Sequence, residues 1–88
     1  MDYKQKLEYQ SNYWYNDGLK KAQIRDLSGA IVSLKRSLQF NRENITARNL
    51  LGLVYYGRGE VAEALVEWII SKNFRASDRK STRLNSSH

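Results

Sequence analysis

Cysteine and proline are both absent from this chain of 88 residues. Without cysteine, neither a disulfide framework nor a thiolate metal site can form, and nothing indicates an oxidising compartment. Without proline, no helix is interrupted by a residue that lacks a backbone N–H. The single histidine, His88, is the last residue, so the sequence contains no histidine cluster. We therefore expect no catalytic site, no metal and no cofactor.

Long apolar runs are missing as well. The longest, Leu50–Tyr56 and Ala64–Ile70, fall far short of the ~20 residues that a membrane span needs. The N-terminus carries charges with no apolar run behind them, unlike a secretory signal peptide. These features favour a soluble, cytoplasmic protein without a membrane partner, and the length allows at most one domain.

Part of the formal net charge of +6 comes from the last residues of the chain. Residues 78–88 match, at every position, the translation of a widely used short-read sequencing adapter, and we interpret them as an artefact. They carry three basic residues and one acidic residue, or +2, which leaves +4 for the rest of the chain. We expect a disordered tail over residues 78–88, and a natural protein that continues beyond about Ser77.

What the sequence does contain is an internal repeat with an offset of 34 residues. Residues 11–44 align with residues 45–78, and conservative pairs fill the positions between identical ones. The identical pairs are Gly18/Gly52, Leu19/Leu53, Ala30/Ala64, Val32/Val66, Ser37/Ser71 and Phe40/Phe74. A period of 34 residues is that of a helix–turn–helix unit stacked in an array. The repeat therefore predicts a binding scaffold rather than an enzyme.

Apolar periodicity predicts four helices and no strand. They run over about residues 4–25, 27–40, 45–58 and 61–73, with short polar or glycine-containing turns between them. Asp26 precedes the second helix as a candidate N-cap. The fold class is therefore all-α, with two antiparallel helical hairpins that form an α-solenoid fragment. We divide the chain into an extension of the first helix (1–10), a first repeat (11–44), a second repeat (45–77) and the tail (78–88).

Small residues recur where the two helices of a hairpin would cross, because Gly18 with Ala30 and Gly52 with Ala64 allow close approach. Together with these, the repeats share bulky and small positions at fixed spacing: Trp14, Leu34 and Ser37, then Leu51, Tyr55, Gly59, Trp68 and Ser71. In type and spacing these residues resemble the tetratricopeptide repeat family over residues 11–76. The resemblance implies a truncated member of that family, which we expect to be bacterial.

Members of this family bind peptides or partner proteins in a concave groove lined by the first helix of each hairpin. The resemblance implies these groove positions: Asn12, Tyr15, Asn16, Leu19 and Gln23, then Thr46, Asn49, Leu50, Leu53 and Tyr56. Tyrosine and asparagine suit such a surface because they provide contact area and adaptable hydrogen bonds. We therefore expect a scaffold that binds a partner peptide or helix.

The fourth predicted helix is apolar on more than one side. Trp68, Ile69 and Ile70 are consecutive, whereas the first repeat has Lys35 and Arg36 in place of the two isoleucines. A helix that is apolar on several sides requires burial on several sides. Either a missing C-terminal portion covers this surface, or the surface serves self-association.

Two other classes of function stay open. A basic surface for nucleic acid could form from these residues: Lys20, Lys21, Arg25, Lys35 and Arg36, with Trp14 and Tyr15 for stacking. The acidic residues Glu8, Asp17 and Asp26 nearby favour an ordinary solvated face instead. Glu60, Glu63 and Glu67 share one helix face, but no histidine, cysteine or phosphate loop accompanies them. The chain could also be the regulatory part of a larger enzyme.

Overall fold

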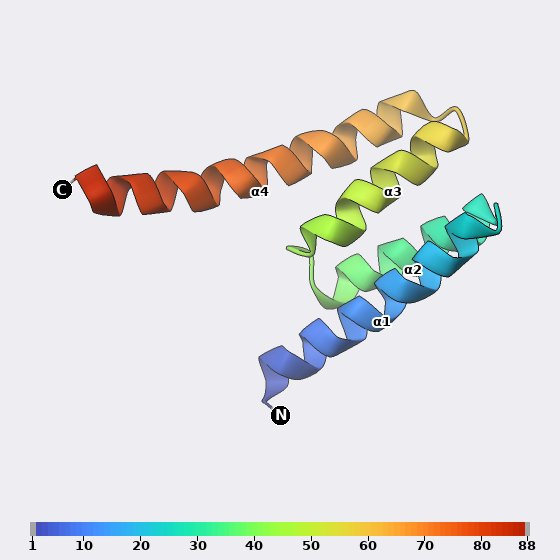
Figure 1. Cartoon of the computed structure of the whole chain (residues 1–88), viewed down its shortest axis with the longest axis horizontal. Helices are drawn as coiled ribbons and strands as arrows, with labels where there is room; N and C mark the ends of the chain where they lie inside the picture. Colours follow the sequence, from blue (N-terminus) through green and yellow to red (C-terminus); the bar gives the residue numbers. More distant parts are fainter. Residues whose placement is uncertain (1, 88) are drawn as a thin grey trace.

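Four helices make up the part of the chain that the structure, a computed structural model, describes: residues 2–87, with the side chains of residues 2–76 (Figure 1). They are α1 (Tyr3–Gln23), α2 (Leu27–Phe40), α3 (Ile45–Gly57) and α4 (Val61–Ser87). α1 packs against α2, α3 packs against α4, and α3 also packs on the first hairpin. No strand occurs within residues 2–87, which confirms the all-α fold of two helical hairpins. None of these helices combines the length and the apolarity that crossing a bilayer requires.

Polar side chains fix where α2 and α3 begin. The carboxylate of Asp26 accepts a hydrogen bond from the N–H of Gly29 at 3.0 Å, and the side chain of Asn44 accepts one from the N–H of Ala47 at 3.1 Å. Both contacts satisfy N–H groups that have no partner within the helix. The structure therefore confirms Asp26 as the cap of α2, and it confirms the predicted span of that helix, Leu27–Phe40.

The turns inside the two hairpins close with the same hydrogen bonds, 34 residues apart. In the α1–α2 turn, the N–H of Arg25 donates to the carbonyl of Ala22 at 3.0 Å, and the N–H of Asp26 donates to the carbonyl of Lys21 at 2.8 Å. The equivalent groups of the α3–α4 turn make the same two bonds at 2.9 Å each. This pattern is the Schellman motif, in which one residue after the helix is left-handed. Arg25 (φ 67°) and Gly59 (φ 84°) are those residues.

The core lies between the first hairpin and α3, and α4 covers one side of it. Glycine sets how closely the helices of each hairpin approach. A Cβ at Gly18 would lie 2.7 Å from Cγ of Leu34, and a Cβ at Gly52 would lie 2.7 Å from Cδ1 of Trp68. Both distances are well inside van der Waals contact, so the predicted role of the two glycines is confirmed. The buried apolar residues are Ala30, Ile31, Leu34, Ala47, Leu51, Val54, Tyr55 and Ala64.

Two helix ends differ from the sequence prediction. α1 ends at Gln23 rather than Arg25, because Arg25 leaves the helical conformation to form the turn. α4 continues to Ser87, whereas the periodicity predicts an end near Asn73. Residues 61–87 contain neither proline nor glycine, so no residue that breaks a helix stops α4 earlier. The side chains of residues 78–88, the predicted tail, lie outside the described residues. The interpretation of this tail as a sequencing artefact stays a hypothesis.

Candidate interaction site

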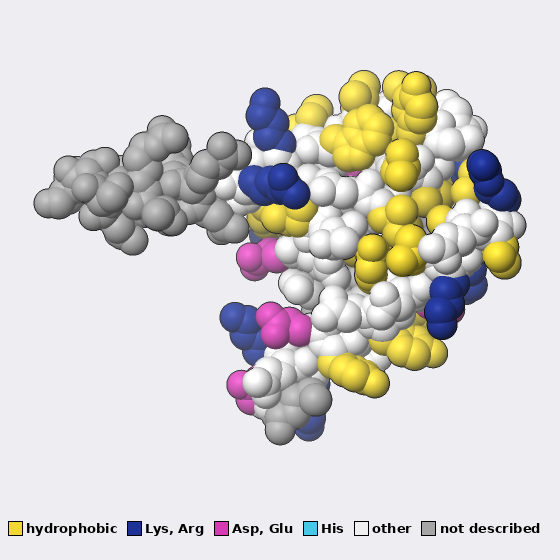
Figure 2. All heavy atoms as spheres, in the orientation of Figure 1, with side chains coloured by type: hydrophobic (Ala, Val, Ile, Leu, Met, Phe, Trp, Pro, Cys, Tyr) yellow, Lys and Arg dark blue, Asp and Glu magenta, His cyan; other side chains and the backbone are white. Residues whose placement is uncertain are grey.

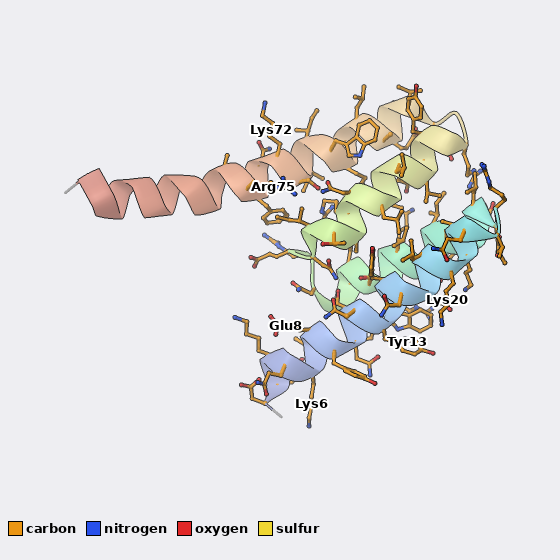
Figure 3. The ribbon with its side chains drawn as sticks, in the orientation of Figure 1. Lys6, Glu8, Tyr13, Lys20, Lys72 and Arg75 are labelled. Carbon is orange, nitrogen blue, oxygen red and sulfur yellow. The ribbon has the colours of Figure 1, made fainter. Side chains whose placement is uncertain are left out.

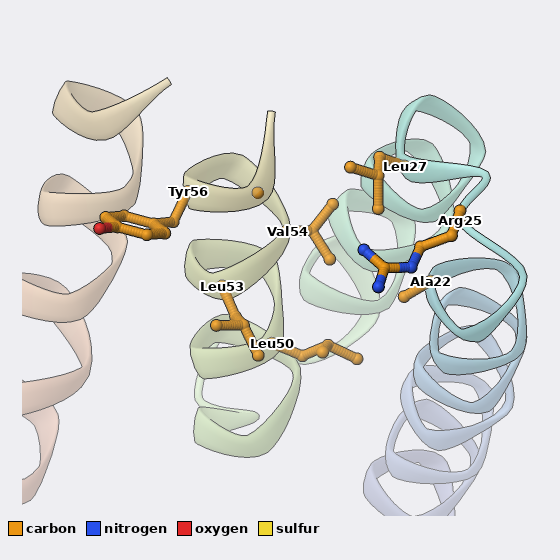
Figure 4. A pocket seen from close by; sticks show the side chains of 8 residues that line it. Ala22, Arg25, Leu27, Leu50, Leu53, Val54 and Tyr56 are labelled. Atoms are coloured by element: carbon orange, nitrogen blue, oxygen red, sulfur yellow. The ribbon is translucent and has the colours of Figure 1, made fainter. Parts of the chain in front are cut away.

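An apolar pocket, which we call the α1–α3 pocket, opens between the α1–α2 turn and α3 (Figure 4). Its volume is about 270 Å³. The wall is built from the two first helices of the hairpins, the α1–α2 turn and the start of α2. The lining residues are Ala22, Arg25, Leu27, Leu50, Leu53, Val54, Tyr56 and Gly57. The pocket therefore lies between the two helices on which the groove was predicted.

Of the described residues, Arg25 is the only charged one in the wall of this pocket. Its guanidinium extends from the α1–α2 turn toward Val54 of α3 (Figure 4). Among the described residues, the side chain of Arg25 takes part in no ion pair and no hydrogen bond. A guanidinium carries five N–H donors and stays charged at any ordinary pH. The pocket thus combines an apolar wall with one cation whose donors are unused in the described structure.

The predicted groove residues do not share one pocket. Leu50, Leu53 and Tyr56 line the α1–α3 pocket. Asn16 lies instead in a polar hollow on α1, and Asn49 lies in a hollow between α3 and α4. The groove positions implied by the family resemblance therefore point to three different surfaces of this chain.

The remaining predicted groove residues surround the pocket or lie further along the helices. Asn12 accepts a hydrogen bond at 3.3 Å from the Asn44 side chain, near the α2–α3 turn. Tyr15 is half-buried and packs against the core. Leu19 is half-buried, whereas Gln23 and Thr46 are exposed. Their places are compatible with a groove surface, but no contact of these residues identifies a ligand.

Sequence reasoning missed five residues of the pocket wall: Ala22, Arg25, Leu27, Val54 and Gly57. The family positions cover only one face of each first helix, and they exclude the turn and the second helix. A usable signal did exist for Arg25. The 34-residue offset places it opposite Gly59, and glycine at one of two equivalent turn positions indicates a left-handed backbone at both.

The second hairpin presents an uncovered apolar face, which we call the end face. Leu65 is 49% exposed, whereas its equivalent in the first hairpin, Ile31, is 7% exposed and buried in the core with α3. Val61 is also exposed, and the rings of Tyr56 and Trp68 lie beside each other with centroids 6.1 Å apart. These four residues, Tyr56, Val61, Leu65 and Trp68, make up the end face. Figure 2 shows apolar side chains gathered over the beginning of α4 and the adjoining part of α3.

The predicted interface residues Trp68, Ile69 and Ile70 do not all belong to this face. Successive residues of a helix point about 100° apart, at 3.6 residues per turn, so three in a row spread over most of its circumference. Trp68 is half-buried against Gly52, Ile69 is 57% exposed, and Ile70 is half-buried. Only Trp68 contributes to the end face.

α1 and α2 share a polar cluster of Asp17, Lys21 and Ser33. Tyr13 and Lys20 project from α1 on the side away from α3 (Figure 3). Behind them, Nζ of Lys21 lies 2.7 Å from Oδ2 of Asp17 and donates to Oγ of Ser33 at 3.0 Å. The hydroxyl of Ser33 in turn donates to Asp17 at 2.5 Å. The hydrogen bond from Lys21, aided by that from Ser33, holds the pKa of Asp17 below its usual value.

Three of the five basic residues that we considered for a nucleic-acid surface lie in different surroundings. Lys21 is paired with Asp17, and Arg25 points into the α1–α3 pocket. The guanidinium of Arg36 lies 4.7 Å from the ring centroid of Trp14, in a cation–π contact. The ring that we assigned to base stacking therefore already has a cation on one face. This arrangement gives no support to a nucleic-acid surface.

Glu67 of α4 and Glu60, which precedes this helix, each contact a different arginine of the second hairpin. Glu67 is paired with Arg48 at 2.8 Å, and both side chains are largely buried. Glu60 lies 3.1 Å from Nε of Arg58 in the α3–α4 turn. In the part of the chain that the structure describes, no group of three residues could hold a metal ion. Glu60 and Glu67 thus each have a cation of their own, and the arrangement does not resemble a pair of catalytic carboxylates.

The fold and these surfaces define an all-α protein of repeated helical hairpins with apolar faces suited to association. Neither a protein-family model nor a solved structure matches the chain. The chain is 42% identical over 45 residues to a Caenorhabditis elegans protein described as BBSome complex member bbs-4. The match spans 51% of this chain but only 10% of that protein. It gives no support to the bacterial source that we expected.

Proposed function

We propose that this chain is a protein-interaction module of the tetratricopeptide type, which binds a partner peptide or helix in the α1–α3 pocket and along the adjoining faces of α1 and α3. The apolar wall around Leu50 and Leu53 carries this proposal, because such a pocket can take up and desolvate an apolar side chain of a partner. Similarity to a member of a protein complex agrees with it. In this proposal the module is a cytoplasmic scaffold, not an enzyme, and it holds no cofactor.

Selection of peptides on the immobilised chain, followed by an NMR titration, tests the proposal. Selected peptides should shift the amide signals of the residues that line the pocket. Leu53→Glu places a charge in the apolar wall, and we expect it to weaken binding by about tenfold or more. Val32→Glu is the matched control, because Val32 is 61% exposed on α2 and Leu53 is 59% exposed. Equal losses in the two variants, or signal shifts confined to α4, would contradict binding in the pocket.

Self-association through the end face is a second candidate function. The observation that favours it is the exposure of Val61 and Leu65, at 47% and 49%, whereas the equivalent residues of the first hairpin, Leu27 and Ile31, are half-buried and buried. Contiguous apolar surface of this kind is typical of an interface. The competing occupant of the same face is a following helix of a longer natural chain, which would bury it within a monomer.

Analytical ultracentrifugation over a range of concentrations separates these two occupants. Self-association predicts a monomer–dimer equilibrium that Leu65→Glu removes, because the variant places a charge at the centre of the contact. Val66→Glu, at a neighbouring position that is 52% exposed, should leave the equilibrium unchanged. A chain that stays monomeric at every concentration would rule out the dimer and favour the following helix.

A further inference from the structure

Arg25 occupies a backbone position that favours glycine. The second hairpin has Gly59 at the equivalent position, with φ 84°, and the first hairpin has Arg25, with φ 67°. A residue with a Cβ is strained in this region of conformational space, whereas glycine is not. Strained residues of this kind cluster at functional sites. The arginine side chain is therefore the feature of this turn that needs an explanation.

Contacts within the fold do not explain it. No residue in the described part of the chain pairs with the guanidinium of Arg25. The guanidinium points instead into the α1–α3 pocket, where Leu27, Leu50 and Val54 form an apolar wall (Figure 4). A cation beside an apolar wall attracts an incoming anion more strongly than a cation in open water does, because the effective dielectric constant is lower there. The site is therefore suited to a ligand that is both apolar and negatively charged.

We propose that Arg25 binds the side-chain carboxylate of an aspartate or glutamate in the partner segment, and that a neighbouring aliphatic side chain of the segment fills the α1–α3 pocket. This inference rests on the proposed function and names its ligand. A guanidinium binds a carboxylate through two parallel hydrogen bonds, which a lysine at this place could not supply. The formal net charge of +4 that remains without residues 78–88 also attracts an acidic segment to this chain.

Two other ligand classes fit the pocket less well. Its volume of about 270 Å³ lies just below the range of about 300–1,000 Å³ that is typical of small-molecule sites. A nucleic-acid strand requires a series of cations along its phosphates, and Arg25 is the one cation that residues 2–76 place in the wall of the pocket. An acidic peptide with an aliphatic residue satisfies both the wall and the charge.

Arg25→Gly separates a binding role from a structural one. Glycine adopts the left-handed conformation without strain, so the melting temperature of the variant should stay the same or rise by a few degrees. The matched control is Gly59→Arg, the reverse exchange at the equivalent turn. A Cβ at Gly59 would meet no atom within 4 Å, so this variant tests backbone strain alone, and its melting temperature should fall.

The binding measurement uses short, end-blocked peptides with Glu-Leu, Gln-Leu or Glu-Ala at the centre, titrated into the isotope-labelled 88-residue chain. The Gln-Leu peptide should bind the wild-type chain about tenfold more weakly than the Glu-Leu peptide, as expected for the loss of a charged hydrogen-bonded pair. The same two peptides should bind Arg25→Gly equally. The Glu-Ala peptide should bind both proteins weakly, because it leaves the pocket empty.

Each contrary outcome identifies which idea fails. If the Glu-Leu and Gln-Leu peptides bind the wild-type pocket equally, the role of Arg25 is wrong while the groove proposal stands. If Arg25→Gly lowers the melting temperature, Arg25 is a structural residue and the inference is again wrong. If none of the peptides shifts the pocket signals at millimolar concentration, both the inference and the proposed function are overturned.

Discussion

The two hairpins of this chain use equivalent positions in different ways. In the first hairpin, the buried hydroxyl of Ser37 donates to the carbonyl of Ser11 at 2.6 Å, and the two hydroxyl oxygens are 3.0 Å apart. The equivalent Ser71 of the second hairpin is also buried, but its hydroxyl has no hydrogen-bond partner among the described residues. The residue equivalent to Ser11 is Ile45, whose side chain has no polar group. The same backbone therefore holds a complete polar contact in one repeat and an incomplete one in the other.

Equivalent faces of the two first helices, α1 and α3, also differ. Asp17 and Lys21 form an ion pair on the first hairpin, whereas the second has the buried residues Leu51 and Tyr55 at those positions. The end face, by contrast, exposes Leu65. A charged surface can remain in water, but an exposed apolar face is stabilised by a partner. The repeated sequence therefore determines the geometry of the helices. Whether an equivalent position carries a polar or an apolar side chain depends on what packs against that face of the hairpin.

The largest expected effect is the difference between Ile31→Ala and Leu65→Ala, two truncations at equivalent positions. Ile31 is buried, so its truncation should lower the free energy of unfolding by about 2–5 kcal/mol. Leu65 is half-exposed and should cost less than about 1 kcal/mol, because its atoms lose few contacts. Urea titrations at low protein concentration measure both values. Equal costs would mean that Leu65 is covered in solution, and the contrast between the hairpins would then be incorrect.

A smaller effect is expected from the two equivalent serines. Ser37→Ala removes the buried hydrogen bond that the carbonyl of Ser11 accepts from the Ser37 hydroxyl. We expect this loss to lower the free energy of unfolding by about 1–2 kcal/mol. Ser71→Ala removes a buried hydroxyl without a partner and should be neutral or slightly stabilising. Thermal melts of the two variants beside the wild type provide the comparison. A large loss of stability in Ser71→Ala would show that this hydroxyl is paired in solution.

Most of the fold follows from the sequence, because local chemistry and periodicity agree in its first three helices. The 34-residue offset, the cap at Asp26 and the small residues at Gly18 and Gly52 each correspond to a contact in the structure. The end of α4 could not be predicted in this way. Apolar periodicity stops near Asn73, but a helix ends where its backbone is broken or capped, and residues 61–87 contain no proline or glycine to do so.

The candidate site was less predictable, because it depends on directions that sequence spacing does not contain. Leu50 and Leu53 were predicted on the groove and do line the α1–α3 pocket. Tyr56 lines the pocket too, but its ring lies beside Trp68 on the end face. Arg25 was considered only as part of a basic patch. The left-handed backbone could have been inferred from the equivalent Gly59, but the role of Arg25 also depends on the direction of its side chain, which becomes visible only in three dimensions.

The smallest expected effect concerns the ion pair that keeps the first hairpin polar. Hydrogen bonds from Lys21 and Ser33 lower the pKa of Asp17 from 3.8, so the folded state favours the ionised carboxylate. The stability from this shift is fully present above the pKa of the unfolded chain, and it is lost as the pH falls through the lower folded value. Because the Asp17 side chain is 33% exposed, we expect a contribution below about 1 kcal/mol.

The wild type should therefore lose slightly more stability than Asp17→Asn between neutral pH and about pH 3. Urea titrations at the two pH values measure the difference. If both proteins lose the same free energy of unfolding on acidification, the ion pair of Asp17 and Lys21 does not stabilise the first hairpin.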